Sequence, residues 1–369
     1  MHTENNIISV FVLSFASFVW AGAMGFALAG RYLRYKESKK MHTHGNWSSM
    51  PRALVILPCK GTDLTIETNM LSLRAQNYPD YDIIAVVDSK DDVAVDHIKA
   101  ADLKYLIADK RFDKCSGKIK NILTAFEKYG RSDRYKVYVV VDADVTASPD
   151  WLSSLVRPLS DSRFGVSTTY PYFNPVCGTW SKIKNVWNFV GLGMMESERT
   201  RFVWGGSMAF RKELVTKELT RSMGTAVADD IEIHRACRRA GLGVYYVRKR
   251  IAFVNVRENF ASFIEWANRQ TALSLSADRK LIVYGKLIYG TDCLLILMGI
   301  LLPFFYGAVW VFLLLPLAVR IAGSYSKMER KGMYVVPATL LVQFIYLYNI
   351  MKAARMENIQ WRGIKYKIG

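Results

Sequence analysis

The sequence predicts an α/β domain with a mostly parallel sheet, joined to transmembrane helices near both ends of the chain. Strand-like and helix-like stretches alternate from residue 53 to residue 141, which is the pattern of a doubly wound sheet. Residues 7–30 contain no charged residue, and long apolar runs return between residues 289 and 351. We therefore expect a soluble α/β domain tethered to a membrane.

The first apolar run has the features of an uncleaved membrane anchor. Residues 7–30 are long enough to cross a bilayer. Five basic residues follow the run directly: Arg31, Arg34, Lys36, Lys39 and Lys40. A signal peptide is the alternative, but signal peptides carry their basic residues before a shorter apolar core. We expect an anchor over 7–30 with its C-terminal flank in the cytosol, and a linker over 41–50.

The soluble part begins with four predicted strands separated by helices. The strands cover 53–57, 81–87, 105–108 and 138–141, and the helices cover 64–76, 93–101 and 119–129. Right-handed crossovers place every strand-end loop on one edge of such a sheet, where ligands bind. This edge is expected to gather Lys60, Asp63, Asp88, Asp92, Asp142 and Asp144.

Two carboxylates follow the predicted strand over 138–141. Asp142-Ala143-Asp144 comes directly after Val139-Val140-Val141, which has the composition of a central parallel strand. Two hard oxygen ligands one residue apart suit a divalent cation, Mg²⁺ or Mn²⁺, that also holds substrate phosphates. An Asx turn without a metal is the alternative interpretation.

Two further motifs lie in the second half of the soluble part. Trp204-Gly205-Gly206-Ser207 allows the backbone to approach a ligand closely, although a tight turn explains it equally well. Asp229-Asp230 precedes a basic helix over 233–240, where an N-cap role is the alternative. The remaining predicted elements are helices over 151–159 and 180–195 and strands over 164–170 and 244–247.

The last third of the chain is expected to lie at or in the membrane. An amphipathic helix over 260–275 carries Trp266, Arg269 and Gln270. Residues 289–322 are too long for one span, and we expect a hairpin kinked near 303–307. The placement of 333–351 stays open, because basic residues flank it on both sides. The expected domains are 7–30 (anchor), 51–258 (soluble domain), 259–288 (interfacial helices), 289–351 (membrane segments) and 352–369 (basic cytosolic tail).

Charge and cysteine content narrow the function classes. The 50 Lys and Arg against 32 Asp and Glu give a formal charge of +18, which suits nucleic acid, anionic lipid or phosphorylated substrates. No zinc finger, RNP-type motif or basic recognition helix is present, so nucleic acid is not an expected partner. The five cysteines are scattered without metal-ligand spacing and indicate reduced, cytosolic thiols.

The carboxylates and lysines together suggest an enzyme that uses a nucleotide sugar. A sugar diphosphate needs a metal and lysines for its charge, and a separate carboxylate must deprotonate the acceptor hydroxyl. Asp142 and Asp144 fit the metal role, Lys60 and Lys118 fit phosphate or base contacts, and Asp230 fits the base. The sequence lacks a Gly-x-x-x-x-Gly-Lys loop, and it lacks a Gly-x-Gly-x-x-Gly after the first strand.

Seven short motifs occur in the order found in family 2 glycosyltransferases, which have the GT-A fold. They are Leu57-Pro58-Cys59-Lys60-Gly61-Thr62-Asp63, Asp91-Asp92, Lys118-Ile119-Lys120-Asn121, Asp142-Ala143-Asp144, Gly206-Ser207 with Arg211, Ala228-Asp229-Asp230 and Trp361-Arg362-Gly363-Ile364-Lys365-Tyr366. The chain resembles most of all the ceramide glucosyltransferase branch. The resemblance implies a membrane-bound, inverting transfer of glucose from UDP-glucose to a lipid hydroxyl.

The resemblance, with the residue pattern, leads to a set of expected site residues. Asp92 and Asp142 take the first two acidic positions of the family, and Asp230 takes the catalytic base. Donor contacts are expected from Lys60, Asp63, Asp88, Asp92, Lys118, Asp142, Gly206 and Arg269. Acceptor contacts are expected from Trp204, Ser207, Asp229, Trp266 and Gln270, and metal contacts from Asp142 and Asp144. Arg269 is also expected to steady the leaving diphosphate.

One motif departs from the family. Where the family has Gln-x-x-Arg-Trp, this chain has Trp266-Ala267-Asn268-Arg269-Gln270. The departure argues against a processive polysaccharide synthase, which is one alternative function. A non-catalytic membrane protein that binds a nucleotide or lipid is the other. We expect a multi-pass protein of the cell membrane with its catalytic domain in the cytosol.

Overall fold

Two compact units make up the chain in the computed structural model, which describes residues 2–40, 47–130, 132–325, 332–361 and 364–368. One unit is largely helical and contains Met1–Ser38, Gly178–Phe189 and Glu258–Gly369. The other is an α/β unit formed by Lys39–Cys177 and Val190–Arg257. The short segment Gly178–Phe189 therefore groups with the helical unit, although the soluble domain was expected to run from 51 to 258.

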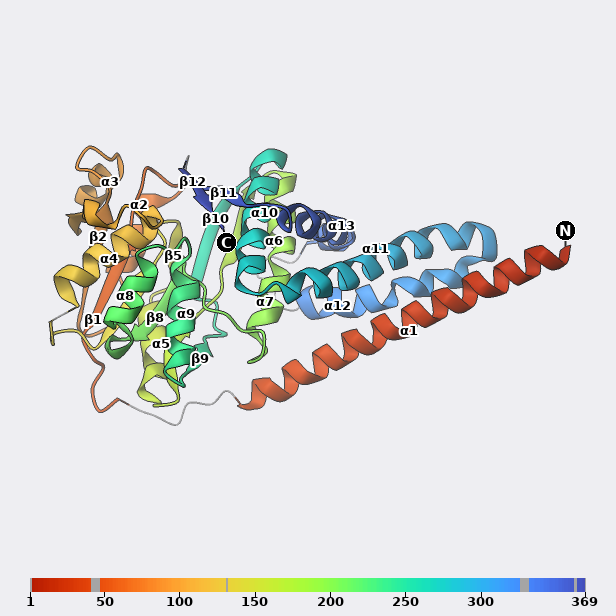
Figure 1. The fold of residues 1–369 in the computed structure, drawn as a ribbon, viewed down its shortest axis with the longest axis horizontal. Helices are drawn as coiled ribbons and strands as arrows, with labels where there is room; N and C mark the ends of the chain where they lie inside the picture. The colour runs from red at the N-terminus through yellow and green to blue at the C-terminus, as the bar shows by residue number, and fades with distance from the viewer. Residues whose placement is uncertain (1, 41–46, 131, 326–331, 362–363, 369) are drawn as a thin grey trace. The chain divides into compact units, whose positions relative to one another are not determined.

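A seven-stranded sheet forms the centre of the α/β unit (Figure 1). Its strand order is β3 (Lys104–Ile107), β2 (Tyr81–Val87), β1 (Ala53–Pro58), β4 (Val137–Val141), β8 (Ser207–Arg211), β6 (Phe164–Thr168) and β9 (Gly243–Tyr246). The four strands from β3 to β4 are parallel, and β8 is antiparallel to both of its neighbours. The predicted α/β class with a mostly parallel sheet is confirmed.

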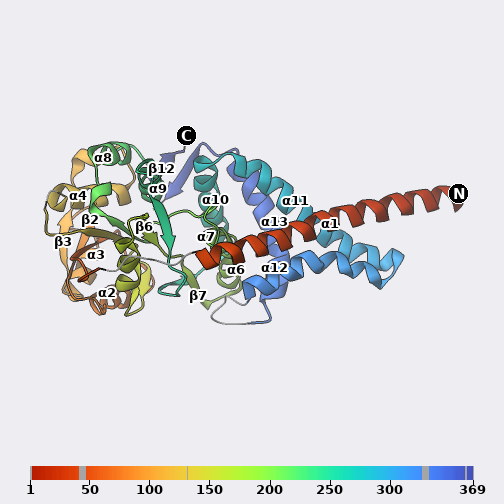
Figure 2. The ribbon, with the colours of Figure 1, turned by 90° about the horizontal axis from the view of Figure 1, so that it is seen from below.

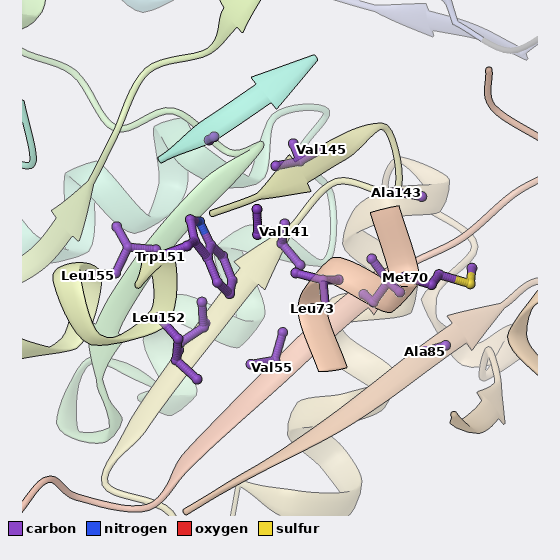
Figure 3. Packing of buried hydrophobic residues seen from close by; sticks show 14 of the residues in the cluster. Val55, Met70, Leu73, Ala85, Val141, Ala143, Val145, Trp151, Leu152 and Leu155 are labelled. Carbon is purple, nitrogen blue, oxygen red and sulfur yellow. The ribbon is translucent and has the colours of Figure 1, made fainter. Parts of the chain in front are cut away.

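Side chains of β1 and β4 point alternately to the two faces of the sheet and contribute to the hydrophobic core on each face. Val55, Leu57, Val139 and Val141 point to one face, which is covered by α2 (Ile66–Arg74), α3 (Ala94–Ala100) and α5 (Trp151–Val156). Figure 3 shows Met70 and Leu73 of α2 and Trp151 of α5 in this layer. The opposite face is covered by α4 (Gly117–Tyr129), α8 (Lys217–Met223) and α9 (Asp229–Arg239). A β-branched strand buried on both faces is typical of a central parallel strand.

A second, three-stranded sheet was not predicted. Its order is β5 (Val145–Ala147), β10 (Ala252–Arg257) and β7 (Tyr172–Cys177), with β10 antiparallel to β5 and parallel to β7. β5 has only three residues, and β7 contains Asn174 and Pro175, so neither has the pattern of a strand in the sequence. Because β5 follows the Asp142–Asp144 turn directly, this small sheet holds the chain as it leaves β4.

The helical unit contains α1 (His2–Lys40), α6 (Thr179–Trp187), α10 (Phe260–Ala277), α11 (Lys280–Tyr306), η4 (Ala308–Leu314), α12 (Leu315–Tyr325) and α13 (Val335–Ala353). Among the described residues, three helices are long and apolar enough to cross a membrane: Val10–Glu37, Lys280–Tyr306 and Val335–Ala353. Figure 2 shows α11 and α12 together with α1, and Leu295 of α11 packs with Ala16 of α1.

The predicted hairpin between residues 303 and 307 is confirmed. α11 ends at Tyr306, and Gly307 turns the chain with a φ of 96°, a value that favours glycine. One other expectation was wrong in detail. The helix expected over 180–195 is two helices, because α6 ends before Asn188 and α7 (Phe189–Met195) begins after it. The change from interfacial to membrane segments expected at residue 289 lies within the helix α11 and stays a prediction.

Buried polar side chains join α6, α10 and α13 in the helical unit. Asn349 is 0% exposed, and its Nδ2 donates to Asn268 Oδ1 at 2.8 Å. The same side chain accepts a hydrogen bond from Trp187 Nε1 at 3.1 Å. Lys184 Nζ lies 2.6 Å from Glu258 Oε1 and 4.2 Å from the ring centre of Trp266. These paired groups fix α10, the helix that carries Arg269, within its unit.

The C-terminal residues form a short antiparallel pair. β11 (Asn358–Trp361) pairs with β12 (Ile364–Lys367). Two residues of the expected family motif in this tail, Arg362 and Gly363, lie outside the described residues, as does most of the linker expected over 41–50.

Candidate active site at the carboxyl edge of the sheet

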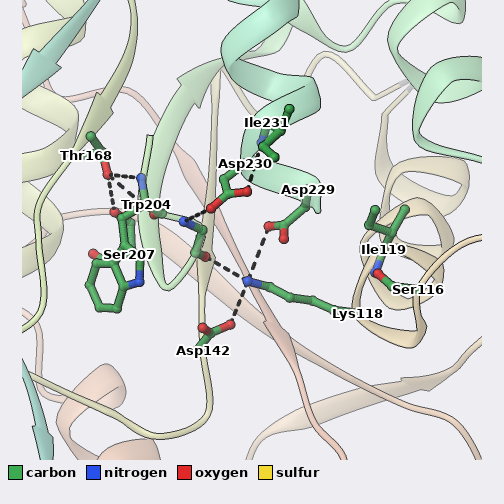
Figure 4. Close-up of polar contacts among 11 residues, drawn as sticks. Ser116, Lys118, Ile119, Asp142, Thr168, Trp204, Ser207, Asp229, Asp230 and Ile231 are labelled. Atoms are coloured by element: carbon green, nitrogen blue, oxygen red, sulfur yellow. Dashed lines mark hydrogen bonds and ion pairs between the residues drawn. The ribbon is translucent and has the colours of Figure 1, made fainter. Parts of the chain in front are cut away.

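A buried lysine joins three segments that are far apart in the sequence (Figure 4). Lys118 Nζ lies 2.7 Å from Asp142 Oδ1, just beyond β4, and 3.3 Å from Asp229 Oδ2, at the start of α9. It also donates to the carbonyl oxygen of Gly205, which precedes β8, at 3.0 Å. The side chains of Lys118 and Asp229 are only 10% and 5% exposed, whereas that of Asp142 is 34% exposed.

Asp230 is oriented by two backbone N–H groups beside this lysine. Its Oδ2 accepts a hydrogen bond from Gly205 N–H at 3.1 Å, and its Oδ1 accepts one from Ile231 N–H at 2.8 Å. Gly205 thus contacts Asp230 through its N–H and Lys118 through its carbonyl group. A Cβ at residue 205 would lie 3.0 Å from Asp229 Oδ2 and 3.1 Å from Lys118 Nζ, so a side chain there would crowd both groups.

The surroundings of this cluster raise the pKa values of Lys118, Asp229 and Asp230 through burial and neighbouring charges. Burial opposes the charge of Lys118, but the carboxylates of Asp142 and Asp229 outweigh it and raise the pKa of Lys118 above its usual value. Burial raises the pKa of Asp229, although the positive charge of Lys118 acts against this. Burial and then the neighbouring charge of Asp229 raise the pKa of Asp230 to about 7. Asp230 is therefore placed to exchange a proton near neutral pH.

A second group of charges lies at the ends of β1 and β2. Lys60 Nζ and Lys120 Nζ each lie 3.4 Å from an oxygen of Asp88. Asp92 Oδ1 accepts hydrogen bonds from Gly61 N–H at 2.8 Å and from Ala94 N–H at 2.9 Å. Lys60, Asp88 and Asp92 therefore lie at the same edge of the sheet, as expected from their positions after strands β1 and β2. Asp63 supports the start of α2, where its carbonyl accepts from Ile66 N–H.

The first turn of α4 joins the two groups. Ser116 Oγ caps this helix by accepting from Ile119 N–H at 3.3 Å. Lys118 enters the carboxylate cluster from this turn, and Lys120 reaches Asp88 from the same turn. Sequence reasoning missed Lys120 as a site residue, although the Lys-x-Lys spacing at a helix start was the available signal.

A buried side-chain amide, that of Asn69, donates a hydrogen bond to the turn over 142–144. Asn69 of α2 is 1% exposed, and its Nδ2 donates to the carbonyl of Ala143 at 2.9 Å. Asp142 N–H donates to the carbonyl of Gly206 at 3.1 Å. Asp142 and Asp144 are both partly exposed, whereas Ala143 between them is buried. Within the described residues, no three His, Cys, Asp or Glu side chains form a metal site by themselves. Asn69 is a further supporting residue that the sequence pattern did not reveal.

The structure corrects two interpretations of the sequence, and a third stays a prediction. Ser207 is not placed to contact an acceptor, because it is 0% exposed and its Oγ accepts from Trp151 Nε1 at 2.7 Å. Asp229 is not the N-cap of α9, since Ala228 occupies that position and Asp229 faces Lys118. Trp266, Arg269 and Gln270 lie on α10 in the helical unit, so their part in the site stays a prediction.

The loop before β8 is a tight turn packed under an indole ring. A Cβ at Gly206 would lie 2.2 Å from Trp204 Cζ2, so a side chain there would displace the ring. Thr168 holds the turn, because its Oγ1 accepts from Trp204 N–H at 3.1 Å and donates to the carbonyl of Ser207 at 2.9 Å. The role of this glycine pair is therefore to shape the turn that presents Gly205 to Asp230.

The raised pKa of Asp230 predicts a stability change with pH. The folded protein keeps the Asp230 proton up to about pH 7, whereas an unfolded aspartate releases it near pH 4. The free energy of unfolding therefore falls as pH rises from about 4 to 7, and the loss stays constant above that range. Asp230→Asn removes this loss, so its unfolding midpoint relative to wild type should rise between pH 4 and 7.

Thermal unfolding of detergent-solubilised protein across this pH range tests the expectation. Asp96→Asn is the matched control, because Asp96 is exposed on α3. A difference between Asp230→Asn and wild type that does not change with pH would contradict the raised pKa.

Several solved structures resemble the fold. A mannosyltransferase from Pyrobaculum calidifontis, in complex with GDP-Man and Mn²⁺, is 15% identical, with coverage of 92% of this chain and 97% of that chain and a TM-score of 0.48. Glucosyl-3-phosphoglycerate synthase from Mycobacterium tuberculosis, in complex with Mn²⁺, UDP and glucosyl-3-phosphoglycerate, is 14% identical, with coverage of 62% and 80% and a TM-score of 0.41. Because both TM-scores lie below 0.5, neither structure supports an assignment of donor, metal or acceptor.

A comparison with protein families is more informative. The family described as glycosyl transferase family 21 matches residues 20–369, nearly the full length. This match confirms the expectation, drawn from the motifs, that the protein is a glycosyltransferase. The finer ceramide glucosyltransferase branch stays a prediction. With the acidic cluster at the carboxyl edge of an α/β sheet and a match of this extent, the chain belongs to glycosyl transferase family 21.

Proposed function

We propose that this enzyme transfers one sugar, glucose by the resemblance of its motifs, from a UDP-sugar to the hydroxyl of a membrane lipid, with inversion. The observation that carries the proposal is the state of Asp230. Two N–H groups orient its carboxylate, and burial beside Asp229 raises its pKa to about 7. A base with this pKa suits proton removal from an acceptor hydroxyl at neutral pH.

The residues at the ends of β1 and β2 would bind the donor. The donor diphosphate is anionic, and Lys60 and Lys120 lie here beside the N-terminus of α4. Helix N-termini and lysines both favour a phosphate group. Asp88, which pairs with both lysines, and Asp92, which accepts from Gly61 N–H next to Lys60, would then receive the donor's ribose or base.

Asp142 and Asp144 have the chemistry to hold Mg²⁺ or Mn²⁺. Both offer hard carboxylate oxygens from a turn that is fixed by Asn69 and by the Gly206 carbonyl. A cation of this kind, when bound, would neutralise charge on the departing diphosphate. Two protein carboxylates leave room for phosphate oxygens and water, as Mg²⁺ prefers.

In the proposed reaction, Asp230 accepts the proton of the lipid hydroxyl while the hydroxyl oxygen bonds to the anomeric carbon. The bond from that carbon to the diphosphate oxygen breaks in the same step, so UDP leaves with the bonding electron pair. A single displacement of this kind inverts the anomeric configuration. Arg269 is proposed to contact the departing diphosphate, since guanidinium groups bind phosphate oxygens in pairs.

Single transfer to a lipid is favoured over the two alternatives. The family assignment sets aside a non-catalytic protein. The changed motif Trp266-Ala267-Asn268-Arg269-Gln270 speaks against a processive polysaccharide synthase. The three helices long enough to cross a membrane support a lipid acceptor. The basic residues from Arg31 to Lys40 support a cytosolic catalytic domain, where UDP-sugars are available.

The first test uses purified protein in native membrane lipids with a panel of radiolabelled UDP-sugars. We expect one UDP-sugar to yield a lipid-soluble product with a single sugar. Asp230→Asn should lower kcat by about 10²–10⁴-fold, because it removes a general base. The UDP dissociation constant should stay nearly unchanged, since the base acts in the transition state. A water-soluble polymer as the product, or UDP binding lost in proportion to rate, would contradict this assignment.

A second test concerns the metal. In calorimetric titrations, Mn²⁺ should strengthen UDP binding to wild-type protein, and Asp144→Ala should lose this gain because one oxygen ligand is missing. Asp144 suits this test better than Asp142, whose removal would also release Lys118. Asp96→Ala, at an exposed site on α3, should behave as wild type. An equal gain from Mn²⁺ in Asp144→Ala and wild type would exclude Asp144 as a metal ligand.

A further inference from the structure

Lys118 was expected to bind the donor, but its contacts in the structure describe another role. An ammonium group has three N–H donors and accepts no hydrogen bond. The Nζ of Lys118 has three partners within the protein, at 2.7 Å (Asp142 Oδ1), 3.0 Å (Gly205 O) and 3.3 Å (Asp229 Oδ2). The ammonium group therefore already interacts with two carboxylates and one backbone carbonyl of the protein, of which the Asp229 contact is an ion pair rather than a hydrogen bond.

The neighbouring lysines differ from Lys118 in exposure. The side chain of Lys118 is 10% exposed, against 18% for Lys120 and 37% for Lys60. The ion pairs of Lys60 and Lys120 with Asp88 are also longer, at 3.4 Å each. Lys118 and Lys120 are two positions apart on α4, so their side chains leave the helix in different directions.

The three partners of Lys118 belong to the segments that carry the expected catalytic groups. Asp142 begins the metal-binding turn, and Asp229 precedes Asp230. Gly205 receives Lys118 at its carbonyl oxygen and donates its N–H to Asp230 Oδ2. Lys118 thus reaches Asp230 through one intervening residue without touching it.

We propose that Lys118 is a positioning residue that acts through Asp142 and Gly205. Its ammonium group ties the turn after β4, the turn before β8 and the start of α9 together. The proposed metal carboxylate and the proposed base are thereby held in a fixed relation, and Lys118 itself does not contact the donor. This inference rests on the proposed function for the identity of the reaction, but it assigns Lys118 a part that the motif alone did not.

The contacts that fix the first turn of α4, which carries Lys118, support the proposal. Ser116, two residues earlier, is 0% exposed and caps α4 through its Oγ. Its N–H also donates to the carbonyl of Ala226, just before α9, at 3.0 Å. α4 and the segment leading to α9 are therefore joined at two points, one through the backbone and one through Lys118.

The test compares Lys118→Met with Lys128→Met, which changes an exposed lysine on the same helix. Misplacement of reacting groups by about 1 Å costs on the order of 10²-fold in rate. We therefore expect Lys118→Met to lower kcat by about that factor, with KM for the UDP-sugar and the UDP dissociation constant changed less than about threefold. Lys128→Met should match wild type in all three.

A second variant disturbs the contact between Lys118 and Gly205 by changing Gly205. Gly205→Ala places a Cβ within 3.2 Å of Lys118 Nζ and both Asp229 carboxylate oxygens. It should therefore lower kcat as Lys118→Met does. Gly193→Ala is its control, because a Cβ there meets nothing within 4 Å. Since both changes break one contact, the double variant should lose little more activity than the worse single variant.

The results separate this inference from the proposed function. A UDP dissociation constant that rises tenfold or more in Lys118→Met, with kcat retained, would overturn the positioning role and restore a donor contact. Fully multiplicative losses in the double variant would also overturn it. UDP binding can be measured without transfer, so it tests Lys118 even where Lys118→Met is inactive. A wild-type enzyme that transfers no sugar from any UDP-sugar would contradict the proposed function instead.

Discussion

The ion pairs of Lys118 place a full positive charge beneath the carboxyl edge of the sheet. Burial alone would drive this lysine toward its neutral form, and it would drive Asp229 toward its protonated form. Each charge is stabilised by the other, which lies 3.3 Å away, and Asp142 lies 2.7 Å from the same ammonium. Removing one partner of a buried pair typically costs about 3–5 kcal/mol, because the other charge is left uncompensated. This edge of the sheet is therefore expected to lose stability when one member of the cluster is removed.

Asp230 differs from its neighbours because backbone N–H groups, rather than a lysine, hold its carboxylate in the part of the chain that the structure describes. Its two oxygens accept from backbone N–H groups, which orient the carboxylate without neutralising it. Burial and the charge of Asp229 then raise its pKa to about 7. The protein loses stability by keeping an ionised carboxylate there at neutral pH. Under the proposed function, this loss of stability accompanies a carboxylate that can accept a proton near neutral pH.

The parts of the fold that follow from short, regular patterns could be predicted from the sequence. The β-branched strands β1 and β4, the helices between them and the hairpin at Gly307 have local signals. The strand-end rule brought Lys60, Asp88, Asp92 and Asp142 to one edge because it depends only on topology. β8 was missed because the glycines before it resemble a ligand loop, yet the strand lies between β4 and β6.

The contacts of individual site residues could not be predicted in the same way. Lys118, Asp142, Gly205 and Asp229 come from four separate elements, and no local pattern shows that they meet. Ser207 has the type and position of a substrate contact, but its partner is Trp151, which is 56 positions earlier in the chain. Asp229 and Asp230 are adjacent in sequence, and only their surroundings show which one faces Lys118. Tertiary contacts rather than residue type therefore assign these roles.

The central claim is that Asp230 acts as a base whose pKa is raised by its surroundings. The pH dependence of kcat/KM for sugar transfer, measured at constant free metal, tests this claim most directly, because it reports essential groups of the free enzyme. The account predicts that kcat/KM is constant at high pH and falls tenfold per unit below an apparent pKa of about 7. A profile that stays flat down to pH 5, where an ordinary aspartate is still ionised, would contradict it.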